Sequence, residues 1–338
     1  MRKKITSFLT YIFFLGIGIF LVWWSLHRIP GNKWNEFSGT LKNARYILVI
    51  PVFFILVCSH VLRSLRWKIL ISPMGYSPSL LNTFFAVMIG YLANLAVPRL
   101  GEVLKCTILA KYEKVPADKL VGTIVTERAI DVVSLGLIFL LVFITQYNVV
   151  GGYAKEIFLQ AFMDKKGSFS LNKILIALFI VLVLFFIIKH WFKKFAHSKI
   201  VIVVKNILRG VWEGLISVIK LKQKKIFIAY TFGIWAMYFA GLWVGLYATE
   251  GTAGVGFSPA LSALAFASIG MILTPGGIGA YAYFLAKVLE LNNVAFTIGY
   301  ANGTLQWFAQ FLIIVLIGFI SLLILPWYNR KKDNVPKK

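Results

Sequence analysis

Uninterrupted apolar runs dominate this chain, and six of them approach or exceed the length of a membrane-spanning helix. A helix needs roughly 20 apolar residues to cross about 30 Å of hydrocarbon. The runs in this range are residues 5–26, 46–62, 120–145, 171–188, 226–248 and 294–325. They predict an all-α, polytopic integral membrane protein with about six full transmembrane helices.

Two further apolar regions are interrupted partway across. Residues 79–97 are followed by Pro98 and Gly101, and the piece that remains, residues 98–110, makes only about 20 Å of helix. Residues 257–274 meet a similar break, formed by Pro275, Gly276, Gly277 and Gly279. Irregular backbone is tolerated at membrane depth only where protein or a wet cavity satisfies it. We therefore expect two re-entrant hairpins, each broken near the midplane.

The two hairpins have similar sequences, and the topology below gives them opposite senses. Ile89 and Gly90 precede the first break as Ile269 and Gly270 precede the second. Paired interrupted segments of opposite sense are typical of an inverted repeat with a site at the midplane. Because the shared pattern is short, chance resemblance is the alternative.

Basic residues gather in the loops of one predicted side. The segment 189–225 carries ten basic residues and a single acid, Glu213. Cytoplasmic loops collect Lys and Arg, so this segment and both termini are predicted to be cytoplasmic and residues 146–170 to face outward. The loop 30–45 violates the rule, because it is basic yet falls outside. Part of the basic segment is expected to be an interfacial amphipathic helix; a seventh span over 200–219 is the alternative.

Composition excludes a soluble globular protein. Hydrophobic residues make up 59% of the chain and charged residues only 14%, against about 45–50% and 25% in globular domains. Given this hydropathy, the net charge of +24 indicates an anionic membrane surface and not nucleic acid as the partner. Cys58 and Cys106 show no metal-ligand spacing, and the chain has no phosphate-binding loop motif, so we predict no cofactor.

Charged residues inside the apolar regions are candidates for function, because each costs about 2.5 kcal/mol or more at membrane depth. Glu102 follows the first break, and Glu127 and Asp131 share one helix face with Arg128 beside it. One interpretation is an ion-pair network that locks the hairpin to its neighbour. The other is a headgroup phosphate site formed by Arg99 and Arg128 with the helix start after Gly101.

Three other sets of residues allow two interpretations each. Arg63 and Arg66, at the predicted end of the second span, either snorkel to the surface or admit anionic headgroups. The N–H groups of Gly276, Gly277 and Gly279 either bind an anion or belong to a plain tight turn. A polar stripe in the last span either joins helices or binds a ligand; it consists of Asn302, Gln306 and Gln310.

Four short motifs occur in order along the chain. They are residues 63–68 (RSLRWK), 90–102 (GYLANLAVPRLGE), 127–131 (ERAID) and 275–279 (PGGIG). With them the chain resembles the family of the lysylphosphatidylglycerol synthase transmembrane region, which includes the flippase-like part of the multiple peptide resistance factors. One departure concerns the last motif: many members carry an acid shortly after it, where this chain has Ala280 and Tyr281.

The resemblance implies an integral protein of the cell inner (plasma) membrane that moves lipids or lipid-linked groups between leaflets. It does not imply an enzyme, because the bifunctional members carry a soluble aminoacyl-transferase domain after the membrane part. Here we expect a single membrane domain over 1–325, with the basic loop 189–225, and a basic cytoplasmic tail over 326–338.

The predicted function is that of a lipid flippase or lipid-linked transporter without covalent chemistry. The predicted partner is a membrane phospholipid with an anionic headgroup, and a homo-oligomer or a separate transferase is compatible with the sequence. The alternatives are a secondary transporter of a small anion and a scaffold for a lipid-modifying enzyme. The predicted substrate-binding residues are Arg63, Arg66, Arg99, Gly101, Glu102, Glu127, Arg128, Asp131, Gly276, Gly277 and Gly279.

The topology can be tested with two cysteines in a background that lacks Cys58 and Cys106. Gly152→Cys should react with an impermeant thiol reagent added outside intact cells, and Lys224→Cys should react only after the membrane is opened. Labelling of both positions from outside would rule out the six-span topology.

Overall fold

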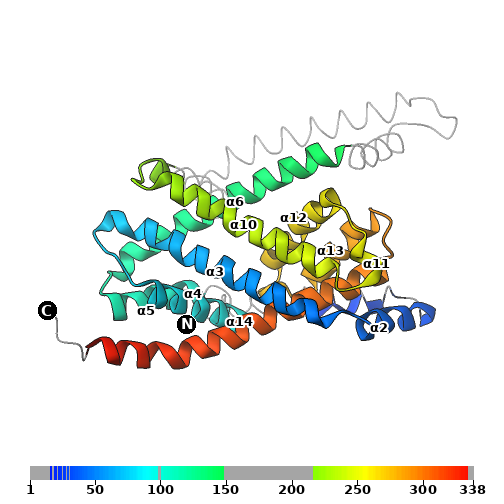
Figure 1. Ribbon diagram of the computed structural model, residues 1–338, viewed down its shortest axis with the longest axis horizontal. Coiled ribbons are helices and arrows are strands. Elements are labelled where there is room, and N and C mark those ends of the chain that lie inside the picture. The colour runs from blue at the N-terminus through cyan, green and yellow to red at the C-terminus, as the bar shows by residue number, and fades with distance from the viewer. Residues whose placement is uncertain are drawn as a thin grey trace, which may run out of the picture. The chain divides into compact units, whose positions relative to one another are not determined.

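The structure, a computed structural model, describes residues 31–97, 100–147 and 216–333, together with scattered positions between 16 and 29. This part of the chain is helical and contains no strand (Figure 1). The span predicted at 171–188 lies outside the described residues, as does the amphipathic helix of the basic loop, and the span at 5–26 lies largely outside them.

The chain divides into two compact units. The first comprises Met1–Glu127 and Ser217–Lys338, and the second comprises Arg128–Ile216. The contacts discussed below lie within the first unit, unless a residue of the second is named. Both predicted hairpins belong to that first unit.

Four helices in the described residues are long and apolar enough to cross a membrane. They are α3 (Val49–Ile71), α6 (Ala117–Thr145), α10 (Lys224–Leu246) and α14 (Phe296–Asp333). They confirm four of the predicted spans and the polytopic, all-α fold. Helix α3 continues for two further turns past the predicted end at residue 62, because its basic residues are buried in the protein. Helix α14 likewise continues past Pro326.

Both predicted hairpins are present, and each breaks at a residue that precedes proline. The first pairs α4 (Leu80–Ala96) with α5 (Leu100–Glu113), and the second pairs α12 (Phe257–Leu273) with α13 (Ala280–Glu290). Helix α4 ends before Val97 and helix α12 ends before Thr274, and both of these residues have an extended backbone, with φ of −141° and −123°. A residue before proline is disfavoured in the helical conformation, so both helices end there.

Glycines allow the two arms of each hairpin to touch through their backbones. A Cβ atom on Gly101 would lie 1.8 Å from the carbonyl oxygen of Gly90, and one on Gly270 would lie 2.8 Å from the carbonyl carbon of Ala280. No side chain larger than hydrogen fits at these crossings. The glycine pattern that suggested an internal repeat therefore has the same packing role in both hairpins.

Apart from the short helices α2 (Trp34–Lys42) and α11 (Glu250–Ala253), the described helices follow the same order twice. Each half contains a 23-residue helix, then a hairpin whose first arm has 17 residues, then a long helix: α3 to α6 in the first half and α10 to α14 in the second. Helices α3 and α10 pack along each other, and Gly233 faces Leu62 while Gly241 faces Leu56, so they run antiparallel. Corresponding helices that run antiparallel are what an inverted repeat requires.

The tips of the two hairpins meet beside α14. Leu95 Cδ2, near the end of α4, lies 3.0 Å from the position of a Cβ atom on Gly276 in the second turn. Trp307 on α14 donates its indole N–H to the carbonyl oxygen of Gly276 at 2.7 Å. These contacts place the interruption of the second hairpin against protein, as the membrane environment requires.

The polar stripe of α14 joins helices. Asn302 donates from Nδ2 to the carbonyl oxygen of Gly245 at 3.0 Å, and Gln306 Nε2 donates to Asn302 Oδ1 at 2.7 Å. Tyr281 on α13 donates to Gln306 Oε1 at 3.3 Å. These buried groups hydrogen-bond one another, which is the typical role of amides inside helix bundles.

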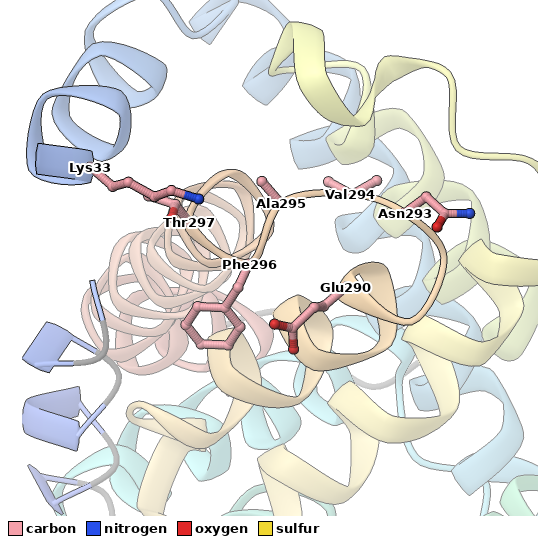
Figure 2. Close-up of a pocket in the computed structure, with 7 residues that line it drawn as sticks. All are labelled: Lys33, Glu290, Asn293, Val294, Ala295, Phe296 and Thr297. Atoms are coloured by element: carbon pink, nitrogen blue, oxygen red, sulfur yellow. The ribbon is translucent and has the colours of Figure 1, made fainter. Parts of the chain in front are cut away.

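A cavity of about 450 Å³ opens at the turn between α13 and α14 (Figure 2). Its lining residues are Lys33, Glu290, Asn293, Val294, Ala295, Phe296 and Thr297. None of them is a residue that the sequence marked as a candidate for binding.

The glycine crossing of the first hairpin can be tested by adding one methyl group. Gly101→Ala should destabilise the protein by about 1–3 kcal/mol, because the crossing backbone must move apart. Gly122→Ala is the control, since a Cβ atom on Gly122 in α6 meets nothing within 4 Å. Thermal unfolding in detergent should separate the two variants, and equal midpoints would contradict the crossing.

Candidate functional site

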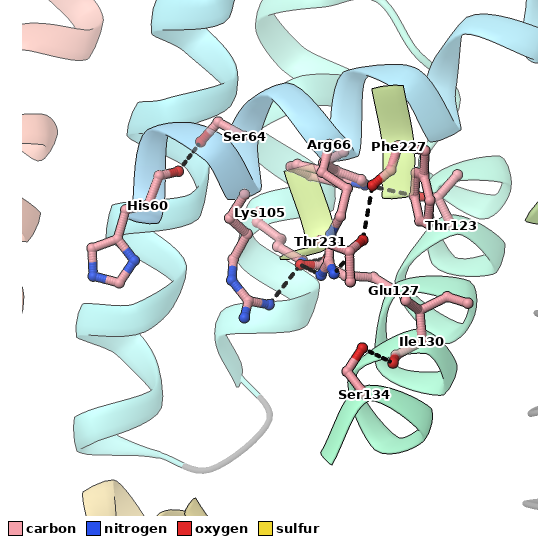
Figure 3. Close-up of polar contacts among 12 residues, drawn as sticks. His60, Ser64, Arg66, Lys105, Thr123, Glu127, Ile130, Ser134, Phe227 and Thr231 are labelled. Carbon is pink, nitrogen blue, oxygen red and sulfur yellow. Dashed lines mark hydrogen bonds and ion pairs between the residues drawn. The ribbon is translucent and has the colours of Figure 1, made fainter. Parts of the chain in front are cut away.

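Four charged side chains from three helices form one cluster, in which three cations surround a single buried carboxylate. They are Arg63 and Arg66 on α3, Lys105 on α5 and Glu127 on α6. Arg63 Nη1 lies 2.8 Å from Glu127 Oε1, and Lys105 Nζ lies 2.8 Å from Glu127 Oε2. Arg66 Nη2 lies 3.5 Å from Oε1 of the same carboxylate. We refer to these four residues as the Glu127 cluster, most of which Figure 3 labels.

The Glu127 cluster is withdrawn from solvent. The exposed fractions of Arg63, Arg66, Lys105 and Glu127 are 7%, 0%, 8% and 2%. Isolated charges at such burial would cost several kcal/mol each, so they persist only where close ion pairs and hydrogen bonds compensate them. The carboxylate of Glu127 on α6 provides this compensation to cations from two other helices, α3 and α5.

Helix α10 adds hydroxyl groups to the cluster. Arg63 Nη2 donates to the phenol oxygen of Tyr238 at 3.0 Å, and Arg66 Nη1 lies 3.4 Å from Thr231 Oγ1. Through these contacts, residues from the second half of the chain, Tyr238 and Thr231, hold the two guanidinium groups of the first half. The cluster therefore draws on both halves of the internal repeat.

Aromatic rings surround the cationic groups. Lys105 Nζ lies 4.6 Å from the centre of the Trp67 ring, and the Arg66 guanidinium lies 5.9 Å from the centre of the Phe227 ring. Trp67 is fixed in turn, because its indole N–H donates to Thr123 Oγ1 on α6 at 2.8 Å. Ring faces stabilise cations more strongly where water is excluded.

The chemistry of this donor set favours an oxyanion. Two guanidinium groups and one ammonium present fixed N–H donors, and guanidinium geometry matches the oxygens of carboxylate and phosphate. Among the four side chains, the positive charges outnumber the negative by two. Within the described residues no group of three or more His, Cys, Asp or Glu side chains is placed to hold a metal ion.

The structure brings together only some of the residues marked by the sequence. Arg63, Arg66 and Glu127 meet in the cluster, and the two arginines are buried and do not snorkel. Glu102 is half-buried on α5. Arg128 is exposed and Asp131 half-buried, and both belong to the second compact unit. Arg99 and the Pro98 beside it lie outside the described residues.

The N–H group of Gly101 is already bound inside the hairpin. It donates to Asn94 Oδ1 at 2.8 Å, so the side chain of α4 caps the start of α5. A ligand could reach this N–H only by displacing Asn94. The predicted anion contact at the helix start is thus occupied by an amide oxygen in this conformation.

The second turn has the backbone of a tight glycine turn. Gly276, Gly277 and Gly279 all have positive φ, of 61°, 74° and 70°. The Gly277 N–H donates to the carbonyl oxygen of Thr274 at 3.0 Å. A Cβ atom on Gly277 would also lie 2.3 Å from Met271 Sδ. Conformation and packing each require glycine here.

Lys105 and Tyr238 are members of the site that sequence reasoning did not select. Lys105 was visible as a charge in the short arm of the first hairpin, but its partner, Glu127, is 22 residues away. Tyr238 is separated from Arg63 by 175 residues, and nothing in its own neighbourhood indicates a polar role. Only the packing of α10 against α3 brings it to the cluster.

The sequence model of the family described as "Lysylphosphatidylglycerol synthase TM region" matches residues 11–318. The chain belongs to this family. It is 23% identical to the UPF0104 membrane protein MJ1595 of Methanocaldococcus jannaschii over 99% of both chains. It is 27% identical to the UPF0104 membrane protein MJ1078 of the same organism, over 69% of this chain and 94% of that one. No solved structure matches significantly.

Membership in the lysylphosphatidylglycerol synthase TM region family agrees with a multi-pass membrane protein. The matched residues include both hairpins and the whole Glu127 cluster. The relatives carry names that state a membrane location and no activity. The function must therefore be argued from the site.

The central place of Glu127 can be tested by removing its charge. Glu127→Gln leaves three buried cations without this carboxylate and should destabilise the protein by about 3–5 kcal/mol. Lys105→Met in the same chain should restore part of that loss, because one cation leaves with its partner. Glu36→Gln, an exposed position on α2 (Trp34–Lys42), is the control. Chemical unfolding in detergent measures all three, and a stable Glu127→Gln protein would contradict the account.

Proposed function

We propose that this protein moves an anionic phospholipid, or a related headgroup lipid, between the leaflets of the cell inner (plasma) membrane without covalent chemistry. The observation that carries the proposal is the convergence of Arg63, Arg66 and Lys105 on one buried carboxylate. Two of the three helices involved, α3 and α6, are long and apolar enough to cross a membrane, and the third, α5, is the short arm of the first hairpin. Charged groups at such depth in a membrane protein typically mark a substrate path.

The headgroup phosphate is the proposed ligand of the cluster. Its oxygens would take the place of the Glu127 carboxylate on Arg63 and Lys105, which present donors at hydrogen-bonding distance from that carboxylate. Glu127 then acts as a placeholder that keeps the cations compensated when no lipid is bound. Glu127 would keep Arg66, whose Nη2 lies 3.5 Å from its Oε1, so the exchange leaves neither the cations nor the displaced carboxylate uncompensated.

The helix surfaces suit the acyl chains. Large apolar side chains on α3 and α10 are exposed, for example Phe54 at 62% and Phe232 at 75%. A lipid can keep its acyl chains in contact with such surfaces while its headgroup passes through the polar interior.

The proposed entry point is the cytoplasmic leaflet. The charge pattern predicts that the turn after α3 lies on the cytoplasmic side, and Arg63 and Arg66 lie in the last three turns of that helix. The same predicted topology has both termini in the cytoplasm. The hairpins, which break at Val97 and Thr274, are the elements proposed to shift as the headgroup passes.

Transport can be tested in a variant that loses one cation of the Glu127 cluster together with the carboxylate. Lys105→Met/Glu127→Gln removes one cation with its anion and should regain part of the stability that Glu127→Gln alone loses, although Arg63 and Arg66 stay buried. The protein that elutes as a monodisperse peak should lose at least tenfold in lipid movement. Lys287→Met/Glu290→Gln, which removes the exposed pair of α13, is the matched control and should transport normally. The assay follows dithionite quenching of fluorescent phosphatidylglycerol in proteoliposomes, beside empty liposomes.

Two outcomes would overturn the proposal. One is full transport by the monodisperse Lys105→Met/Glu127→Gln protein. The other is the absence of lipid movement by the wild type combined with uptake of labelled inorganic phosphate, which would identify a carrier of a soluble anion. A wild type that does neither would favour a scaffold for a separate enzyme.

A further inference from the structure

Tyr238, in the second half of the chain, touches Arg63 directly. Its phenol oxygen accepts a hydrogen bond from Arg63 Nη2 at 3.0 Å, while Arg63 Nη1 donates to Glu127 Oε1 at 2.8 Å. The two nitrogens belong to one planar guanidinium group, so the phenol and the carboxylate bind neighbouring donors of the same fork. An oxyanion that replaces the carboxylate on Nη1 therefore arrives beside the phenol.

The half-buried phenol keeps a donor that nothing in the described part of the chain accepts. Its oxygen accepts from Arg63, but its own O–H has no acceptor among residues 31–97, 100–147 and 216–333. Thr231, the other α10 hydroxyl near the cluster, differs, because its Oγ1 donates to the carbonyl oxygen of Phe227 at 2.9 Å. Tyrosine hydroxyls withdrawn from water usually find a hydrogen-bond partner. The unused O–H therefore points to a ligand that accepts hydrogen bonds.

Tyr238 occupies the place in the second half that Arg63 occupies in the first. Arg63 lies fourteen residues after Val49, where the 23-residue helix α3 begins. Tyr238 lies fourteen residues after Lys224, where the 23-residue helix α10 begins. Equivalent residues of an inverted repeat that touch each other lie where the two halves meet, and transporters of this architecture bind their substrates there.

The phenol is held by a second ring. Trp235, one turn earlier on α10, packs edge-to-face against Tyr238 with 5.9 Å between the ring centres and 80° between the ring planes. The hydroxyl therefore reaches the guanidinium group of Arg63 from a supported side chain. A donor fixed in this way loses little conformational freedom when a ligand binds to it.

We propose that Tyr238 is a further binding residue of the site, whose O–H donates to an oxygen of the oxyanion held by Arg63. The inference rests on the proposed function, which brings that oxyanion to Arg63 and Lys105. Guanidinium, ammonium and phenol all present donors to it, so the ligand is a group with several acceptor oxygens, such as a phosphate. The phosphate of a lipid headgroup and free phosphate share this chemistry, and the test separates them.

The test measures the dissociation constant of phosphatidylglycerol for each variant by native mass spectrometry in detergent. Isothermal titration calorimetry follows inorganic phosphate, the second probe. Tyr238→Phe removes the hydroxyl and keeps a ring against Trp235. Tyr247→Phe is the matched control, because Tyr247 is an exposed tyrosine just after α10 and outside the cluster.

A fluorinated side chain separates donation to the ligand from a role in positioning Arg63. Replacement of Tyr238 by 3-fluorotyrosine keeps the ring and the hydroxyl, but it makes the O–H a stronger donor and the oxygen a weaker acceptor. Binding is measured at a mildly acidic pH, where the phenol keeps its proton. A phenol that donates to the ligand and a phenol that only accepts from Arg63 then give changes of opposite sign.

Tyr238→Phe should weaken the binding of phosphatidylglycerol about tenfold or more, because a hydrogen bond to a charged oxygen is lost. Tyr247→Phe should bind like the wild type. The fluorinated protein should bind more tightly than the wild type, since its phenol is the better donor. Inorganic phosphate, added in excess, should not displace the lipid, whose acyl chains contribute to binding.

The failures are distinguishable. Unchanged affinity in a monodisperse Tyr238→Phe protein overturns this inference while the proposed function stands, as does unchanged or weaker binding in the fluorinated protein. If Tyr238→Phe does not fold, the fluorinated protein decides alone. A wild type that binds inorganic phosphate but no anionic lipid overturns the proposed function, and loss of phosphate binding in Tyr238→Phe would then support the contact with a soluble oxyanion. A wild type that binds neither probe overturns both.

Discussion

The cost of burying charge in an apolar interior is the constraint on which this structure depends. Three cations and one carboxylate lie almost fully withdrawn from water, and the carboxylate of Glu127 holds cations from α3 and α5 against its own helix, α6. Because a single residue compensates three charges, these helices cannot separate without exposing several of them to the apolar surroundings. The same dependence makes Glu127 the natural point of exchange for an incoming oxyanion.

The hairpins make this arrangement possible at membrane depth. Pro98 follows an extended Val97, so α4 ends partway across and α5 begins as a short separate helix that carries Lys105. The backbone crossing at Gly90 and Gly101 keeps that short helix against α4. In the second hairpin α12 likewise ends before an extended residue, Thr274, and Trp307 of α14 donates a hydrogen bond to the turn that follows. In the second hairpin this irregular backbone is covered by protein, since Thr274, Pro275 and Gly277 are buried.

Four of the spans and both hairpins could be predicted from the sequence, because apolar length and the placement of proline and glycine are local properties. The partners of the charges could not. Arg63 follows the last residue of an apolar run, so it looked like a surface residue, and Glu127, its partner, is 64 positions away. Gly101 looked open to an anion because its cap, Asn94, lies on the other arm of the hairpin. Long-range packing decides both cases.

The most direct test of the account is to map where an anionic phospholipid touches the protein. A phosphatidylglycerol with a photoreactive group in the headgroup would be cross-linked in proteoliposomes, and the modified peptides would be identified by mass spectrometry. The account predicts adducts on α3 near Arg63 and on α5 near Lys105, both suppressed by excess unlabelled phosphatidylglycerol. Adducts confined to other helices, or insensitive to the competitor, would contradict the claim that the Glu127 cluster receives the headgroup.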